Sequence, residues 1–324
     1  MRKQLSIPTF SILAILLAVT LAGCPQKPAK NGSVDDNTAP VAEQSTRRLT
    51  WPDGAHAPKD PVRVAFVPSV EAGTIETQLG EFEKQLSELI GHPVEADVVL
   101  SYSACIEQMG AGHFDLAMLP PFAYVLAHER YNFRVALKVV RDGKATYRGE
   151  IITRTDSGIN TLEDLRGKTF AFTEATSASG HLYPKTFLIT MGIDPDKDFA
   201  DAVFKGDHSA VVQSVFQGQV DAGACYDDAR ERLLETEPTI MEQTKVVAYT
   251  PDIPGDTVSF RAELTDPFWE VVSDAMIEIS HKGQDGVLYK IYEIDELIPA
   301  QDSDYDPIRQ MVETLDYDLS SAVN

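Results

Sequence analysis

Two stretches of this chain carry the same order of strand and helix patterns, and this order constrains the fold more than any other feature. The first begins with an apolar strand pattern at 61–68 and continues into an amphipathic helix. The apolar residues of that helix recur at spacings of four, three, four and three: Ile75, Leu79, Phe82, Leu86 and Leu89. The pattern restarts near residue 160. Strands that alternate with helices predict mainly parallel sheets joined by crossover helices.

Further elements follow from the same apolar patterns. Strands are predicted at 93–100, 114–119, 133–140, 149–155, 169–173, 219–226 and 245–254. Helices are predicted at 103–109, 162–168, 176–193, 206–218 and 266–280. Two α/β units of similar size, with a return to the first, are typical of an α/β type II periplasmic-binding-protein fold. That fold has two lobes, a two-strand hinge and a ligand cleft at the carboxyl ends of strands.

The expected lobe boundaries follow from where the pattern restarts and returns. Lobe 1 is expected at 61–145 and 248–324, and lobe 2 at 146–247. The two hinge crossings are expected near Arg141–Glu150 and Lys245–Thr250.

The first 60 residues predict export and anchoring rather than folded structure. Arg2 and Lys3 precede an apolar run of about 13 residues, which is shorter than the roughly 20 that span a bilayer. The run ends in a Leu-Ala-Gly-Cys sequence that resembles a bacterial lipobox, so residues 1–23 are expected to be a lipoprotein signal peptide and Cys24 a diacylated, palmitate-bearing anchor. An ordinary thiol after an ordinary signal peptide is the alternative. Residues 24–60 lack an apolar period and are expected to be a flexible tether.

Composition excludes several classes of partner. The formal charge of −22 comes without any basic run, so nucleic acid and anionic membrane surfaces are not expected partners. Any anionic ligand must then be held by local geometry against the field of the whole chain. Cys105 and Cys225 are too few and too far apart for a disulfide framework. The pattern predicts no cofactor and no metal site.

Two predicted helix starts carry groups that suit an anion. Thr176–Gly180 offers three hydroxyls, free backbone N–H groups and the positive end of a helix dipole. Plain N-capping by Ser or Thr is the alternative. His208 opens the helix at 206–218, where a neutral imidazole could donate one N–H to an oxyanion. A surface histidine is the alternative there.

Two further loops bring carboxylates to strand ends. Asp227 and Asp228 follow the strand at 219–226, and Asp252 and Asp256 lie in the turn after the return strand. A carboxylate can accept the O–H of a partly protonated phosphonate or phosphite, or an organic ammonium, and it would repel proton-free sulfate. Solvated turn residues are the alternative.

Taken together, these segments resemble the phosphate/phosphite/phosphonate-binding (PhnD-like) proteins of ABC importers. The likeness covers nearly all of 61–317, through DLRGKTFAF, TSASGHLYP, GIDP, GDHSAVVQSVFQGQVDAGACYDD, IPGD and SDYDPIRQM. It implies a monomeric, extracytoplasmic solute-binding protein, not an enzyme, that closes on a phosphonate or phosphite and then docks on an ABC permease. It also implies the following ligand-binding positions: Tyr102, Tyr124, Ser177, Ala178, Ser179, His208, Asp227 and Asp256.

The chain departs from the family pattern at two places. Ala178 replaces the usual Thr, which removes a hydroxyl and keeps the backbone N–H. A hydrogen bond lost to a charged group costs about 1.5–3 kcal/mol if nothing replaces it. Pro120 and Pro121 stand where relatives often carry a Gly-Pro step, so fewer donors are expected there.

Two other functions remain open at this point. A sensory binding protein that feeds a membrane kinase would bind the same kind of ligand, and Cys105 and Cys225 could then serve arsenite recognition if they met across the cleft. A hydrolase could use Ser177 or Ser179 with His208, although the chain has no Gly-x-Ser-x-Gly elbow.

Overall fold

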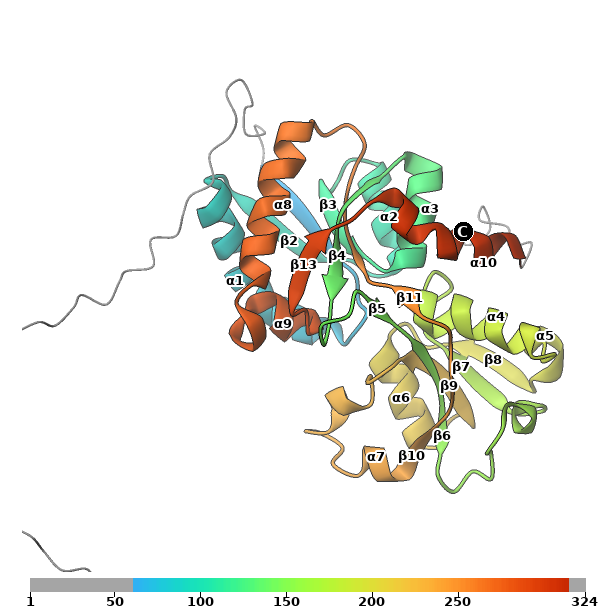
Figure 1. Cartoon of the computed structure of the whole chain (residues 1–324). Helices are drawn as coiled ribbons and strands as arrows, with labels where there is room; N and C mark the ends of the chain where they lie inside the picture. Colours follow the sequence, from blue (N-terminus) through green and yellow to red (C-terminus); the bar gives the residue numbers. More distant parts are fainter. Residues whose placement is uncertain (1–60, 315–324) are drawn as a thin grey trace, which may run out of the picture. The chain divides into compact units, whose positions relative to one another are not determined.

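The computed structural model describes residues 61–314, which form two main sheets with helices packed on both faces of each (Figure 1). We call the part built on the six-stranded sheet the first lobe and the part built on the five-stranded sheet the second lobe. The predicted signal peptide, Cys24 and the tether at 24–60 lie outside the described residues. Among the helices within 61–314, none combines the length and the apolar character that a bilayer span requires.

The first sheet has the strand order β13-β4-β12-β3-β1-β2. Its strands are β1 (Val62–Phe66), β2 (Val94–Val98), β3 (Leu116–Leu119), β4 (Arg134–Val140), β12 (Thr257–Phe260) and β13 (Glu296–Pro299). β1 is parallel to β2 and β3, whereas β12 is antiparallel to β3 and β4, and β13 is antiparallel to β4. β1, β2, β3 and β4 therefore point the same way, as a mainly parallel sheet requires, and β12 and β13 point the other way. β12 is antiparallel because it returns from the second lobe and enters the sheet from the opposite end.

The two faces of the first sheet bury alternate residues, as the period of two in a strand requires. Val62, Val64 and Phe66 pack with α1 (Ala72–Ile90), α8 (Asp266–Ser280) and α9 (Val287–Tyr292). Ala65 and Val67 face the other way. They pack with α2 (Tyr102–Gly110), α3 (Pro121–Tyr131) and α10 (Asp306–Thr314).

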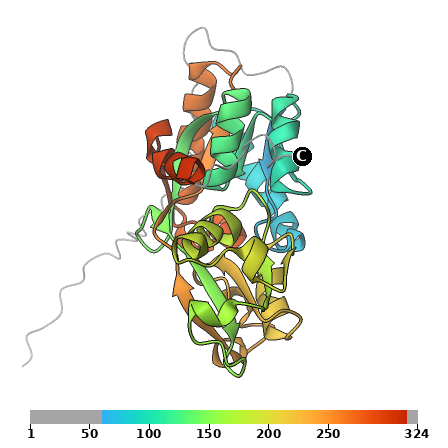
Figure 2. The ribbon, with the colours of Figure 1, turned by 90° about the vertical axis from the view of Figure 1, so that its right-hand side faces the viewer.

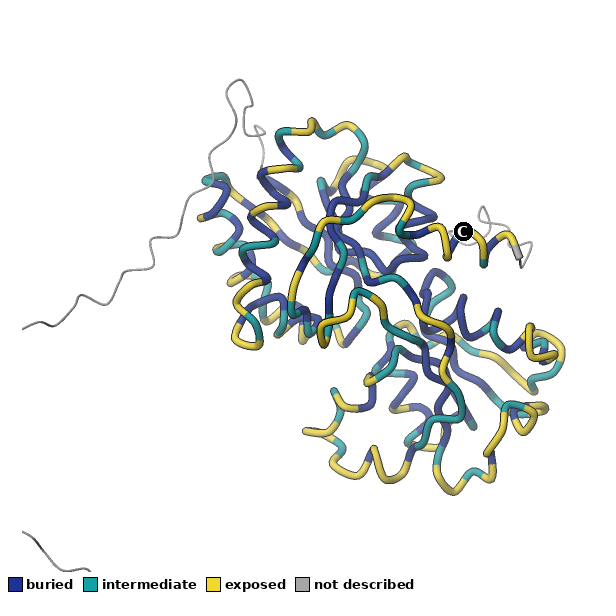
Figure 3. The backbone as a smooth tube through the Cα atoms, viewed as in Figure 1, coloured by how far each residue is buried: buried dark blue, intermediate teal, exposed yellow. Residues whose placement is uncertain are grey.

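The second sheet follows the same plan with the strand order β10-β6-β9-β7-β8. Its strands are β6 (Gly149–Arg154), β7 (Thr169–Phe172), β8 (Asp201–Phe204), β9 (Ala222–Tyr226) and β10 (Thr244–Tyr249). β7 is parallel to β8 and β9, and the β6–β9 and β6–β10 pairs are antiparallel. Ile151 and Phe172 pack against α4 (Tyr183–Thr190), while Ile152 and Ala171 pack against α6 (His208–Phe216). Figure 2 shows the ribbon turned by 90°, and Figure 3 shows the dark buried strands beneath exposed loops.

Two chain segments connect the lobes, and a short antiparallel ladder joins them. β5 (Thr146–Tyr147) lies between β4 and β6, β11 (Ile253–Pro254) lies between β10 and β12, and the two pair with each other. The first crossing falls inside the predicted Arg141–Glu150. The second does not fall at Lys245–Thr250, because that stretch is largely β10 and is hydrogen-bonded along β6. The exact lobe limits remain a prediction.

Most predicted elements are confirmed, and several were not predicted. α1 ends at Ile90 with Gly91 in the left-handed conformation, and α8 has the predicted bounds. Among the elements without a sequence prediction are α3, β5, β8, β12, α9, β13 and α10. The remaining short helices are η1 (Leu162–Leu165), η2 (Ala178–Leu182), α5 (Pro195–Asp198), η3 (Glu231–Leu233), α7 (Ile240–Gln243), η4 (Gly283–Asp285) and η5 (Asp302–Tyr305).

Candidate functional site

A cavity of about 40 Å³ is lined by residues of both lobes and of the segments that connect them. Five helices begin at its wall, and each contributes a residue at or just before its first turn. These residues are Val70 before α1, Tyr102 in α2, Pro120 before α3, Ser177 before η2 and His208 in α6. Helix N-termini present unpaired N–H groups and positive potential, so their convergence suits an anion.

The loop before η2 combines capping with anion-binding capacity. Ser177 Oγ accepts a hydrogen bond from the Gly180 N–H at 3.0 Å, so the capping alternative is correct for this hydroxyl. Ser179 lines the cavity beside Ser177. Among the described residues, the N–H groups of Ala178 and Ser179 donate to no acceptor. A Cβ at Gly180 would lie 2.1 Å from Thr173 Oγ1, so this tight loop requires glycine.

Ala178 was predicted as a ligand-binding position, but it is not among the residues that line the cavity. Its methyl group is fully buried in an apolar cluster that joins the lobes and includes Tyr102, Leu182 and Tyr183. The side chain does not line the cavity. A Thr at this position, as in the family pattern, would place a hydroxyl in this buried apolar contact between the lobes. Ala178 places only a methyl group there.

His208 is buried, so the surface-histidine alternative is wrong. Its Nδ1 accepts a hydrogen bond from the Tyr226 N–H at 3.2 Å, which assigns the proton of the neutral ring to Nε2. Burial lowers the pKa of His208 to about 3, and the charge of Arg141 acts in the same direction. The ring therefore stays neutral and can offer Nε2–H to an oxyanion.

Tyr102 carries a polar group that needs a partner. The residue is fully buried and lines the cavity, yet its hydroxyl has no hydrogen-bond partner among the described residues. An unpaired buried hydroxyl costs about 1–3 kcal/mol. A ligand oxygen in the cavity would satisfy it. Burial also raises the pKa of Tyr102, so the hydroxyl remains a donor.

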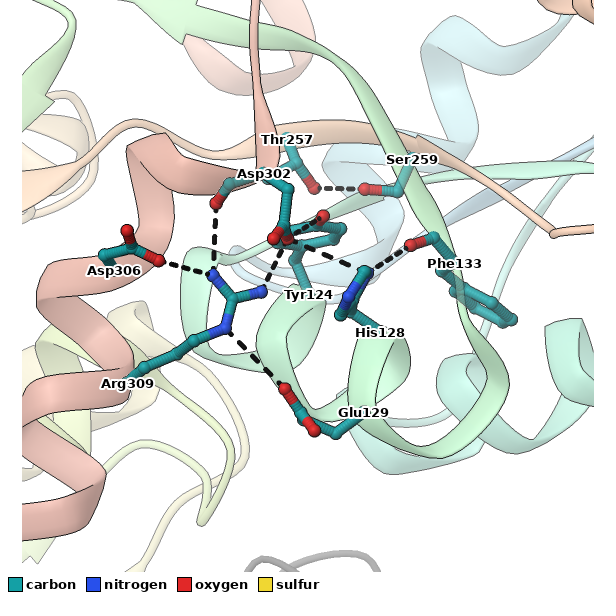
Figure 4. Close-up of polar contacts among 9 residues, drawn as sticks. All are labelled: Tyr124, His128, Glu129, Phe133, Thr257, Ser259, Asp302, Asp306 and Arg309. Carbon is teal, nitrogen blue, oxygen red and sulfur yellow. Dashed lines mark hydrogen bonds and ion pairs between the residues drawn. The ribbon is translucent and has the colours of Figure 1, made fainter.

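Tyr124 and Asp227 were predicted in the site, and the structure places both outside the cavity wall. The Tyr124 hydroxyl donates to Asp302 at 2.6 Å, in the polar cluster of Figure 4 that also contains Arg309. Asp227 accepts hydrogen bonds from the backbone and side chain of Arg148. The order of residues in the sequence did not show that the Tyr124 hydroxyl and the Asp227 carboxylate already have hydrogen-bond partners.

Asp256 lines the cavity as predicted, but it already has a cationic partner there. Asp256 Oδ2 lies 2.8 Å from Arg141 Nη2, and Arg141 Nε donates to the Tyr292 carbonyl at 3.0 Å. A second arginine, Arg232, also lines the cavity, with Nε 3.0 Å from Glu293 Oε2.

Sequence reasoning missed several residues of the cavity wall, among them two arginines and three tyrosines. These five are Arg141, Tyr147, Tyr226, Arg232 and Tyr292. Arg141 was included only as part of the hinge, and Tyr226 only as the last residue of the strand predicted at 219–226. The available signal was that Arg141 directly follows a strand that enters a hinge.

The two cysteines do not contribute to this site. Cys105 packs in the apolar cluster of the first lobe and Cys225 in that of the second, and neither lines the cavity. Burial raises the pKa of both thiols, which disfavours the reactive thiolate. The arrangement gives no support to arsenite recognition.

A polar contact beside the cavity joins the start of α2 to the second lobe. Glu174 Oε2, from the loop after β7, accepts a hydrogen bond from the Tyr102 N–H at the start of α2 at 3.1 Å. Burial raises the pKa of Glu174 to about 7. This contact exists only while the two lobes meet.

The fold and the cavity define a class of protein: a type II periplasmic binding protein, in which two α/β lobes enclose a small ligand. Residues 64–305, more than half of the chain, match the family of ABC transporter, phosphonate, periplasmic substrate-binding proteins. The chain belongs to this family.

Individual relatives agree with this assignment. The chain is 31% identical over 176 residues to a phosphate-import protein PhnD of Mycolicibacterium smegmatis, covering 51% of this chain and 55% of that protein. It is 25% identical to the solved binding protein of an ABC phosphonate transporter from Pseudomonas aeruginosa, with a TM-score of 0.72 over 82% of this chain and 89% of that one. It is also similar in fold to Prochlorococcus marinus PhnD1 in complex with methylphosphonate, at 21% identity and TM-score 0.72, over 79% and 98% of the two chains.

Proposed function

We propose that this chain captures a compact phosphorus oxyanion, a phosphonate or phosphite, and presents it to an ABC permease after cleft closure. The observation that carries the proposal is the convergence of unpaired donors on one small cavity. These donors are the free N–H group of Ser179, the Nε2–H of His208 and the partnerless hydroxyl of Tyr102. The relatives that bind phosphate or methylphosphonate support the same ligand class.

The cavity volume argues for a ligand of few atoms. A bound water needs about 10–15 Å³ of such space. The 40 Å³ of this cavity therefore suits an anion about as large as phosphite or methylphosphonate. A catalytic role is not proposed, since among the described residues neither Ser177 nor Ser179 is hydrogen-bonded to His208.

A thermal-shift and calorimetric screen tests this function. The purified chain is mixed with phosphite, methylphosphonate, phosphate, sulfate and arsenite, and ligands that bind the native state raise the melting temperature. We expect a shift with at least one phosphorus oxyanion and none with sulfate or arsenite. No shift with any phosphorus compound contradicts the proposed function.

We also propose that Cys24 anchors the mature protein to a membrane outside the cytoplasm. The support is the Leu-Ala-Gly-Cys sequence that follows the apolar run. Metabolic labelling with a palmitate analogue should label the wild-type chain and not Cys24→Ala. Equal labelling of both would exclude the anchor at this residue.

A further inference from the structure

Arg141 is held in a fixed orientation at the cavity wall. It follows β4, and its backbone N–H donates to the Lys144 carbonyl in the turn that precedes β5. Its Nε and Nη2 donate to the Tyr292 carbonyl and to Asp256. Among the described residues, Nη1 donates to no acceptor, so this nitrogen remains available at the cavity that Arg141 lines.

The same contacts remove the carboxylates as receptors for a cation. Each carboxylate of the cavity wall lies beside a guanidinium: Asp256 at 2.8 Å from Arg141, and Glu293 at 3.0 Å from Arg232. His208 stays neutral. The wall therefore carries two guanidinium groups and no carboxylate that lacks a cationic partner.

These contacts affect an anionic ligand and a ligand with an ammonium group differently. An oxyanion finds guanidinium, hydroxyl and N–H donors, which form the strongest hydrogen bonds with anionic oxygens. An ammonium group on an organic arm finds no carboxylate that is free to receive it, and it would have to displace Arg141, a like charge, to reach Asp256. Juxtaposed like charges discriminate strongly against a ligand.

We propose that Arg141, held by Asp256 and the Tyr292 carbonyl, determines specificity by admitting phosphorus oxyanions without a cationic group and rejecting aminoalkylphosphonates. This inference rests on the proposed function and narrows its substrate class. It differs from the expectation that Asp256 itself receives a proton or an ammonium from the ligand.

The test compares two ligands of the same shape. Aminomethylphosphonate and ethylphosphonate have the same number of heavy atoms in the arm and differ in the terminal ammonium. Isothermal titration of the purified chain, with methylphosphonate as reference, should show ethylphosphonate binding at least about tenfold more tightly than aminomethylphosphonate, as expected for an unfavourable like-charge contact. Equal affinities, or a preference for the amine, would overturn the inference and leave the proposed function intact.

Variants identify the residue responsible. Arg141→Met keeps side-chain length, removes the cation and frees Asp256, so the preference should fall at least about tenfold or reverse toward the amine. Arg63→Met removes a charge at an exposed position where Arg63 pairs with Glu95, and it should keep the wild-type ratio. Should Arg141→Met fail to fold, Asp256→Asn serves instead, and it should strengthen rejection of the amine.

An unchanged ratio in the folded Arg141 or Asp256 variant overturns the assignment. Absence of binding by every phosphorus compound overturns the proposed function and this inference with it.

Discussion

At the residue scale, His208 shows how burial decides which chemistry a side chain can perform. Its Nδ1 is occupied by the Tyr226 N–H, so only Nε2 remains for the cavity. The two ring nitrogens therefore have separate tasks, one structural and one directed at the ligand. Two amide side chains can separate these tasks, because Asn retains an acceptor near Nδ1 and Gln retains a donor near Nε2.

We expect His208→Asn to fold normally and to bind methylphosphonate roughly 10- to 100-fold more weakly, the effect of one lost hydrogen bond to a charged group. His208→Gln should retain more affinity and lose more thermal stability, because the Tyr226 N–H loses its acceptor. Calorimetry and thermal melts measure both effects. Equal losses of affinity in the two variants would contradict the division of tasks.

The pH dependence of stability checks the same residue. The pKa of His208 is about 3 in the folded chain, while the unfolded histidine titrates near its usual value of about 6.5. The unfolded state therefore binds more protons between these limits, so stability contributed by the neutral ring is present above pH 6.5 and is lost as the pH falls toward 3. Melting temperatures between pH 7 and 5 should fall less steeply in His208→Asn than in the wild type.

The residues of the site differ in whether the neighbouring sequence is enough to predict their role. Ser177, Ser179 and His208 could be predicted because each lies at a helix start that the apolar pattern marks. Arg141 and Arg232 reach the cavity from segments without a strong period, and their role depends on contacts with Asp256 and Glu293 that no local pattern encodes. Tyr124 was misplaced for the same reason, since its partner Asp302 is 178 residues away.

At the element scale, the start of α2 depends on a carboxylate from the other lobe. The Tyr102 N–H is one of the helix's unpaired donors, and Glu174 accepts its hydrogen bond across the interface. Such a contact favours the closed arrangement of the lobes and does not require that Glu174 touch the ligand.

Glu174→Ala should weaken methylphosphonate binding roughly two- to tenfold, the value of one ordinary hydrogen bond, while Glu174→Gln should stay closer to the wild type because its amide oxygen still accepts. Glu163→Ala is the matched control in the same lobe, since Glu163 is exposed and pairs with Arg166. If Glu174→Ala and Glu163→Ala behave alike in titration calorimetry, the contact plays no part in closure.

Element prediction succeeded where one face of an element is apolar over several turns and failed where tertiary contacts decide. α1 and α8 have strong stripes and were found, whereas β12 has only four residues, too short a stretch for its polar and apolar alternation to mark a strand. Its place between β3 and β4 follows from the path of the chain through the second lobe.

At the scale of the whole molecule, the net charge opposes the ligand. The chain carries −22, and a phosphonate or phosphite is itself an anion. The local donors must therefore overcome a repulsive field during approach, and salt screens that field with a Debye length of about 8 Å at 0.15 M.

Association of methylphosphonate should consequently become faster, roughly two- to tenfold, as salt rises from 0.01 to 0.15 M. Stopped-flow tyrosine fluorescence with two different monovalent anions separates screening from competition for the site. A rate that falls with both salts would mean that Arg141 and Arg232 dominate the field at the cavity mouth.

The position of β12 also sets an order of folding. The second lobe is one unbroken stretch of chain, so all of its strands have been synthesised once Tyr249 has been added. The first sheet remains divided until Thr257–Phe260 arrive, because β3 and β4 meet only through β12. A nascent chain that stops short of residue 257 therefore holds one complete lobe and one split in two, with the edges of β3 and β4 open to pairing with another chain.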